Sequence, residues 1–220
     1  MSDAGKRPTR PALSREFILR TALALVDRDG LDALTMRRLG AELRVDPMAV
    51  YRYVPGKGEL LDGIAEILWR DGLGIEELAD AAPDADWREL LARAMSGFRD
   101  ELSRHPRAVP IVATHPLVTT EQYEFLERGL ELLEPHGFEP GPLTVALLDV
   151  LASFTIGHVL AEVAEPAGGA GGEFDPAELA AHAERFPRVV RLLGTVDAAA
   201  FDGGWQFGLG LRAILNGWHS

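Results

Sequence analysis

The sequence predicts an all-α protein with an N-terminal three-helix helix-turn-helix domain and a larger helical domain behind it. Apolar residues recur at spacings of three and four along most of the chain, which is the period of an amphipathic helix. No stretch of useful length alternates apolar and polar residues as a strand would. Helix-capping residues also precede short helical segments near the N-terminus, at Ser14, Thr35 and Asp46.

We expect three parts along the chain: a flexible basic tail, a helix-turn-helix domain and a larger helical domain, at residues 1–13, 14–58 and 59–220. Residues 1–60 carry 11 Lys+Arg and 8 Asp+Glu, a net charge of +3, whereas the whole chain has −12. The negative charge therefore lies outside the N-terminal part, which keeps nucleic acid possible as a partner. For the tail, contact with DNA and a solvated segment are equally supported.

The first expected helix covers residues 14–29. Ser14 can cap it, Phe17, Ile18, Ala22, Leu25 and Val26 form its apolar face, and Gly30 ends it. A second helix follows the cap Thr35, with Leu39 and Leu43 on its buried face and Ala41 as the small residue at a close crossing. Asp46 and Pro47 start a third helix, whose Val50 and Val54 face inward.

The outer side of this third helix fits entry into a DNA major groove, because it is small and apolar at its start and surrounded by hydroxyl and cationic groups. Such αα-hairpins are also common as purely structural units. If DNA binds, we expect backbone phosphates to contact Thr35, Arg37, Tyr51, Tyr53 and Lys57. We expect base edges to contact Pro47, Met48 and Ala49, with Arg37 or Arg52 reaching a guanine.

Residues 14–70 resemble the DNA-binding domain of the TetR family of bacterial transcriptional repressors. The resemblance rests on L-T-M-R-R-L-G-A-E-L-x-V (34–45), A-V-Y-R-Y-V (49–54) and G-K-x-E-L-L (56–61). Arg44 stands in the turn where the family usually has glycine; if that position is left-handed, arginine costs about 1 kcal/mol. The resemblance implies a homodimer on a pseudo-palindromic double-stranded DNA operator, controlled by a small-molecule effector.

Further helices are expected through the rest of the chain. Asp86 and Glu89 form a capping box for a helix to about Arg104. The other expected segments are a short one to Thr114 and helices at about 119–135, 143–165, 188–196 and 201–218, with a short helix from Asp175 and a linker at 166–172.

Two of these segments, 143–161 and 201–218, have little polar face and predict a dimeric four-helix bundle; packing inside one subunit is the alternative. In a dimer, arginine at Leu151 or Leu209 is expected to give monomers.

Ligand-binding candidates lie between the DNA-binding segment and these helices. They are Trp87, Met95, Phe98, His115, Gln122, Tyr123, Phe154 and His158, with His105 as a further candidate. Asp86-Trp87-Arg88, T-E-Q-Y-E (120–124) and S-F-T-I-G-H-V-L (153–160) resemble the tetracycline-repressor branch. That branch binds a drug–magnesium chelate, but the two positions implied as coordinating are Ser153 and Ala161 here, and an asparagine that contacts the drug falls on Ala94. The resemblance thus favours an apolar or aromatic effector without magnesium, and we expect no metal site and no cofactor.

Several classes of protein are disfavoured. Without cysteine, no disulfide framework or thiolate zinc site is possible. The N-terminus has no apolar signal region and segment 143–161 is interrupted by Asp149, Ser153 and His158, so we expect a cytoplasmic protein without a membrane span. The six histidines lie on different segments, without a nucleophile motif or phosphate loop, so we do not expect an enzyme. A constitutive or partner-protein-controlled DNA-binding protein remains the alternative to a ligand-released repressor.

Overall fold

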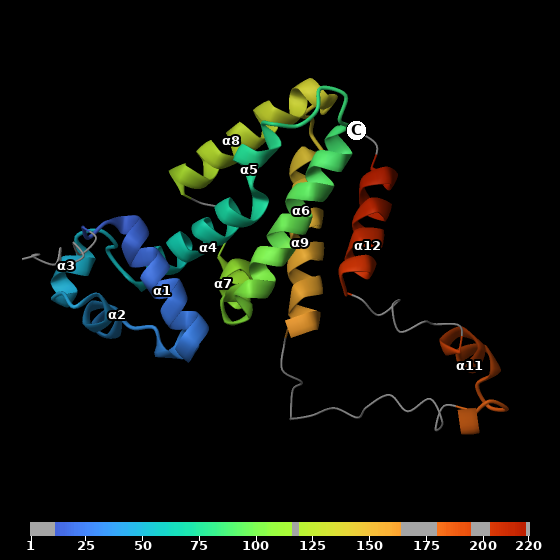
Figure 1. The fold of residues 1–220 in the computed structure, drawn as a ribbon, viewed down its shortest axis with the longest axis horizontal. Helices are drawn as coiled ribbons and strands as arrows, with labels where there is room; N and C mark the ends of the chain where they lie inside the picture. Colours follow the sequence, from blue (N-terminus) through green and yellow to red (C-terminus); the bar gives the residue numbers. More distant parts are fainter. Residues whose placement is uncertain (1–11, 116–118, 164–179, 195–202, 219–220) are drawn as a thin grey trace, which may run out of the picture.

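The computed structural model describes residues 12–115, 119–163, 180–194 and 203–218. This part of the chain contains only helices, turns and loops, and the predicted all-α fold is confirmed (Figure 1). The α-helices are α1 (Arg15–Asp29), α2 (Met36–Leu43), α3 (Pro47–Tyr51), α4 (Lys57–Leu73), α5 (Ile75–Leu78), α6 (Trp87–Arg104), α7 (Val109–Thr114), α8 (Thr120–Leu133), α9 (Thr144–Val163), α11 (Pro187–Leu193) and α12 (Gly203–Gly217). Short 3₁₀ turns lie at Leu31–Ala33, Pro106–Ala108 and Glu134–His136.

The three N-terminal caps are confirmed. The Ser14 hydroxyl accepts from the Phe17 N–H, and the Thr35 hydroxyl accepts from the Arg38 N–H. The Asp46 carboxylate accepts from the Met48 N–H, directly before Pro47 at the first position of α3. Each cap satisfies an N–H that the helix itself leaves unbonded, so local sequence signals set where α1, α2 and α3 begin.

Arg44, between α2 and α3, adopts the left-handed conformation with φ 55° and ψ 44°. It is the only non-glycine residue with positive φ in the described part of the chain. Gly74, after α4, has nearly the same angles, φ 54° and ψ 44°. Arg44 and Gly74 therefore share the same left-handed backbone conformation. This conformation costs free energy for a residue with a Cβ atom, but not for glycine.

Exchanging the residue types at these two positions should have opposite effects. We expect Arg44→Gly to raise the free energy of unfolding by about 1 kcal/mol, and the melting temperature by about 2–4 °C. Gly74→Ala should lower both by similar amounts, because its new Cβ meets only the flexible side chain of Glu77, no closer than 3.4 Å. Thermal and urea unfolding of both variants measure this. A stabilising Gly74→Ala, or a destabilising Arg44→Gly, would contradict the explanation from backbone strain.

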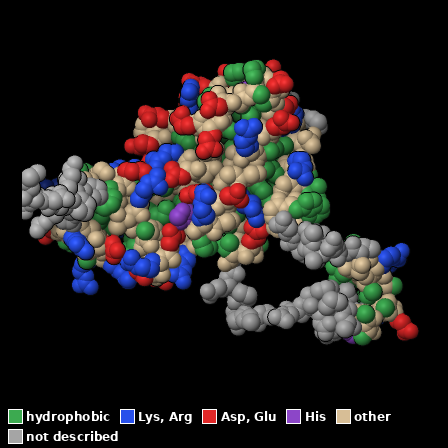
Figure 2. All heavy atoms as spheres, viewed as in Figure 1, with side chains coloured by type: hydrophobic (Ala, Val, Ile, Leu, Met, Phe, Trp, Pro, Cys, Tyr) green, Lys and Arg blue, Asp and Glu red, His purple; other side chains and the backbone are tan. Residues whose placement is uncertain are grey.

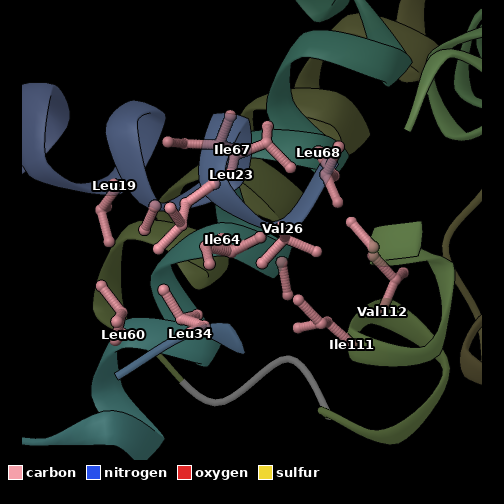
Figure 3. Packing of buried hydrophobic residues seen from close by; sticks show 14 of the residues in the cluster. Leu19, Leu23, Val26, Leu34, Leu60, Ile64, Ile67, Leu68, Ile111 and Val112 are labelled. Atoms are coloured by element: carbon pink, nitrogen blue, oxygen red, sulfur yellow. The ribbon is translucent and has the colours of Figure 1, made fainter. Parts of the chain in front are cut away.

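The N-terminal helices pack against the rest of the protein in a first hydrophobic cluster. Side chains of α1 and α4 pack together, and Ile111 and Val112 of α7 join them (Figure 3). Fully buried members include Leu19, Leu60 and Ile64. Because α4 belongs to this cluster and also packs along α6, it is shared by the two expected domains, and their division after residue 58 stays a prediction.

The following helices form a second layer. The Asp86 carboxylate caps α6 by accepting from the Arg88 N–H, one residue earlier than the capping box predicted with Glu89. A complete capping box occurs instead at α8, between Thr119 and Gln122. Helices α6, α9 and α12 lie side by side, and α8 runs along α4 and α5, while α11 stands apart (Figure 1). The sequence interpretation overlooked α5, which is a single turn.

Several sequence-based expectations fall outside the described residues. They are the basic tail as far as residue 11, the linker at 166–172, the start of a helix at Asp175 and the first two residues of segment 201–218. The described part of that last segment is α12, which begins at Gly203.

The predicted partner helices α9 and α12 each bury only one face within the subunit. Leu147, Leu151 and Val159 of α9 are fully buried, whereas Val145 is 76% exposed. On α12, Phe207 and Leu211 are buried, but Trp205 and Leu209 are about half exposed. Arginine at Leu151, which was expected to give monomers, is not a clean test of dimerisation, because this leucine lies in the core of one subunit and a charge there would disrupt folding. By length and hydropathy alone, α9 is also the one described helix that could cross a membrane.

Candidate nucleic-acid interface and ligand cavity

The hairpin of α2 and α3 is held by a close backbone contact at Gly40. A Cβ built there would lie 3.2 Å from the Val45 carbonyl oxygen and 3.3 Å from Pro47 Cα. Ala41, which the sequence analysis placed at this crossing, is exposed instead. Gly40 is thus the small residue that lets the two helices meet, while Val50 and Val54 anchor α3 in the core.

The predicted DNA contacts lie on a surface that we call the recognition surface: the outer side of α2 and α3 and the start of α4. Met48 is 66% exposed, and Pro47 and Ala49 beside it are half-buried. The remaining members are exposed: Thr35, Arg37, Tyr51, Arg52, Tyr53 and Lys57. The structure therefore brings all nine predicted residues to one end of the molecule.

Cations on and near the recognition surface fall into two groups. Arg28 pairs with Glu42 at 3.1 Å, and Arg38 pairs with Asp29. Within the described residues, no ion pair engages Arg37, Arg52 or Lys57. Lys and Arg side chains gather along the edge formed by α2, whereas Asp and Glu gather at the opposite end, around α8 (Figure 2). Three cations thus remain for an external anion.

A cavity of about 640 Å³ lies behind α4, between that helix and α5, α6, α7, α8 and α9. Its wall is predominantly apolar. The lining includes Trp69, Leu73, Leu91, Ala94, Met95, Val112, Phe125, Leu126, Leu130, Leu133, Leu148, Ala152 and Ile156, and its polar groups are Glu66, Arg70, Thr114, His115, Glu121, Gln122, Asp149 and Ser153. This size and lining are typical of a small-molecule site.

Of the predicted ligand-binding residues, Met95, His115 and Gln122 line this cavity. His115 Nδ1 lies 2.7 Å from the Asp62 carboxylate on α4. The Gln122 side-chain oxygen accepts from the Thr119 N–H in the capping box. A role in ligand binding stays a prediction for these three.

Other predicted ligand-binding residues lie elsewhere. Phe98 is fully buried behind Trp69, with ring centroids 3.9 Å apart. Trp87 packs edge-on against Phe138, and His105 Nδ1 lies 2.8 Å from an Asp27 carboxylate oxygen. Phe98 thus fills the contact between α4 and α6, Trp87 packs on a loop residue, and His105 is engaged by a carboxylate of α1.

The remaining three face other surroundings. Phe154 stacks on Phe207 of α12, with centroids 5.3 Å apart. His158 Nε2 lies 3.0 Å from the Gly203 carbonyl oxygen, at the start of the same helix. Tyr123 is exposed on the outer side of α8. None of the three lines the cavity.

Most residues of the cavity wall were not among those predicted from the sequence. Four residues of α8 line the cavity at spacings of three and four: Gln122, Leu126, Gly129 and Leu133. This helical period could have identified the face of α8 that lines the cavity. Glu66 and Trp69 gave no comparable signal, since both belong to an almost wholly apolar face of α4.

Glu66 joins the cavity to the N-terminal helices. Its carboxylate is buried, with 7% of the residue exposed, and accepts two bonds of 3.0 and 2.9 Å from the Arg15 guanidinium on α1. The pKa of Arg15 is raised, first by this hydrogen bond and also by the charges of Glu66 and Glu121. A group in the cavity wall therefore holds α1 through a bidentate ion pair.

No three His, Asp or Glu side chains among the described residues are grouped closely enough to hold a metal ion. Of the two positions implied as coordinating by the tetracycline-repressor resemblance, Ser153 lies in the cavity wall, and Ala161 is exposed on α9.

Comparison with known families agrees with this geometry. The model of bacterial regulatory proteins of the tetR family matches residues 18–64, and the tetracyclin repressor-like C-terminal domain matches residues 80–220, more than half of the chain. The chain belongs to the TetR family. It is thus a transcriptional regulator with a DNA-binding N-terminal domain and a ligand-binding C-terminal domain, in a family of regulators and not of enzymes.

Relatives of this TetR-family regulator are found among curated proteins. It is 28% identical to the HTH-type transcriptional repressor DrrR1 of Streptomyces coeruleorubidus, over 98% of this chain and 82% of that protein. It is 31% identical to the class A tetracycline repressor protein from transposon 1721 of Escherichia coli, over 93% of this chain and 90% of that protein.

Solved structures of the same family superimpose on nearly the whole chain. A possible TetR family transcriptional regulator from Streptomyces coelicolor has 32% identity and a TM-score of 0.67, covering 93% of this chain and 98% of its own. ActR from Streptomyces coelicolor, in complex with (S)-DNPA, has 26% identity and a TM-score of 0.72, covering 94% and 97%. The same regulator has also been solved in complex with actinorhodin.

Proposed function

We propose that this TetR-family regulator is a cytoplasmic homodimeric repressor that binds a pseudo-palindromic operator and is released by a small, largely apolar or aromatic effector without magnesium. The observation that carries the proposal is the position of α4. This helix begins at Lys57, on the recognition surface, and its second half forms a wall of the 640 Å³ cavity.

Coupling follows from this shared helix. A helix of 17 residues is about 25 Å long and moves as a unit. Two polar contacts, from Glu66 to Arg15 and from Asp62 to His115, connect it to α1 and to the end of α7. An effector that shifts α4 changes the spacing of two recognition surfaces, which must lie about one helical turn of DNA apart. Effector and operator then oppose each other reciprocally, typically by 1–3 kcal/mol.

Dimerisation through α9 and α12 accounts for their exposed apolar faces. Val150 on α9 and Trp205 and Leu209 on α12 are at least 40% exposed in the single subunit, and none of them lines the cavity. The exposed side of α9 also carries the small residues Ala146 and Gly157, which allow a facing helix to approach closely. A soluble protein gains free energy by covering such faces.

Lys57 provides a direct test of phosphate contact. We expect Lys57→Ala to weaken binding to all DNA sequences about equally and to lower the slope of log affinity against log salt by about one. Fluorescence anisotropy at several salt concentrations measures the slope. Arg38→Ala is the matched control, since Arg38 is already paired with Asp29, and it should change the slope less. An unchanged slope for Lys57→Ala would place this lysine away from the phosphates.

Operator release tests the effector side of the proposal. We expect apolar or aromatic small molecules to release the operator equally well with and without a chelator. Release that requires magnesium would contradict the metal-free cavity. If no small molecule causes release, control by a partner protein or constitutive repression becomes the better explanation.

A further inference from the structure

Some charged side chains on the cavity wall form ion pairs with other residues of the protein, and others do not. Arg70 lies 2.9 Å from Glu16 and 3.2 Å from Asp71, so its charge is already paired outside the cavity. His115 is paired with Asp62. Glu121 and Asp149, by contrast, take part in no ion pair among the described residues. The wall thus offers carboxylates to a ligand and no comparable unpaired cation.

Glu66 retains hydrogen-bonding capacity toward the cavity. An ionised carboxylate has about four acceptor positions, and Arg15 uses one on each oxygen. A ligand can therefore donate to Glu66 while Arg15 stays in place, or compete with it. In a buried position such a charge-assisted bond is roughly twice as strong as a neutral one.

The carboxylates Glu66 and Glu121 lie at the same end of the cavity. Glu121 is in the first turn of α8, and its negative charge contributes to the raised pKa of Arg15, the partner of Glu66. Thr119, two residues earlier, lines a smaller pocket together with Arg15 and Asp62. The opposite end is lined by leucines from α5, α6 and α8: Leu78, Leu91, Leu130 and Leu133. The cavity therefore has an acidic end beside the DNA-binding domain and an apolar end away from it.

An anionic ligand group has little to bind at this acidic end. The N-terminus of α8 would attract an anion if its first N–H groups were unbonded. The capping box already bonds the N–H groups of Thr119 and Gln122, and the Glu121 carboxylate in the first turn repels an anion from the remaining ones. Without unpaired cations in the wall, the field of the remaining carboxylates favours positive charge.

We propose that the effector is an amphipathic cation, with an aliphatic amine at the Glu66–Glu121 end and its apolar body among the leucines of the other end. This inference rests on the proposed function and names its ligand class. The amine competes with Arg15 for Glu66, which loosens the ion pair between α1 and α4. The charge of the ligand, and not only its bulk, is thereby linked to release of DNA.

Three probes with one aromatic body test the charge preference: 2-naphthylmethylamine, 2-naphthalenemethanol and 2-naphthoate, each titrated into the full-length protein by calorimetry at neutral pH. We expect the amine to bind at least about tenfold more tightly than the alcohol, and the carboxylate to bind most weakly. Equal or tighter binding of the alcohol or the carboxylate overturns the inference, as does failure of all three to bind. The inference can fail in this way while the proposed function stands, because other small molecules still release the operator.

Variants locate the amine. We expect Glu121→Gln to weaken the amine about fivefold, as for loss of one partly screened charge pair, and to leave the alcohol unchanged. Glu124→Gln, on the same helix but outside the wall, should change neither. Glu66→Gln should weaken the amine further; if this variant does not fold, Glu121→Gln alone decides. An amine affinity unaffected by Glu121→Gln overturns the proposed position.

Discussion

Replacing Leu209 with arginine is expected to convert the protein into a monomer that binds its operator at least about 10²-fold less tightly. Leu209 is 50% exposed on α12, so the change does not disturb the core of one subunit. In the proposed dimer it would place an unpaired charge in an apolar interface. A monomer engages one half-site and loses the gain from joining two sites, which is about 10²–10⁴-fold.

Light scattering at micromolar concentration and operator anisotropy together test this expectation. Tyr123→Arg on α8 is the matched control. Tyr123 is exposed to about the same extent as Leu209 and lies outside α9 and α12, so this substitution adds the same charge away from the proposed interface. It should remain dimeric and retain operator affinity. A wild-type monomer, or a Leu209→Arg variant that remains a dimer, would contradict the proposed interface.

Gly97→Ala is expected to lower the free energy of unfolding by about 2 kcal/mol, within the range for overpacked helix contacts. A Cβ at Gly97 on α6 would lie 2.6 Å from the Gly72 carbonyl oxygen on α4. A backbone atom cannot rotate away as a side chain can, so α4 and α6 must separate. The melting temperature should fall by about 4–8 °C.

The same substitution in open space provides the control for Gly97. A Cβ at Gly58, near the start of α4, meets nothing within 4 Å, so Gly58→Ala should be neutral or stabilising. Thermal unfolding compares the two. Equal effects of the two substitutions would mean that the Gly72–Gly97 contact does not set the distance between α4 and α6. If Gly97→Ala folds, it should also change the effect of an effector on operator binding, because α4 lies against the cavity.

Structural features that depend on only a few neighbouring residues, such as helix caps, could be predicted from the sequence. Ser14, Thr35 and Asp46 each bond an N–H two or three positions ahead, so the type of residue and its neighbours were sufficient. The turn between the second and third helices predicted backbone strain at Arg44 if this residue is left-handed, and the structure shows that it is. The helical fold followed from periodicity in the same way.

The cavity could not be derived in this way, because its wall depends on how six helices pack. Phe98 and Met95 are neighbours on α6, yet Phe98 fills the crossing behind Trp69 and Met95 reaches the cavity. Periodicity also could not divide α9 into faces, since apolar residues surround it almost completely. Only the fold shows that Leu151 is buried in the subunit and that Val150 faces outward.

Sequencing the genomic DNA fragments retained by the purified protein tests the central claim most directly. The claim is that two recognition surfaces, held by one dimer, bind a specific pseudo-palindromic operator. We expect one enriched motif with two inverted half-sites whose centres lie about one helical turn of DNA apart. Uniform retention of fragments without a shared motif, or an enriched motif with a single half-site, would contradict it.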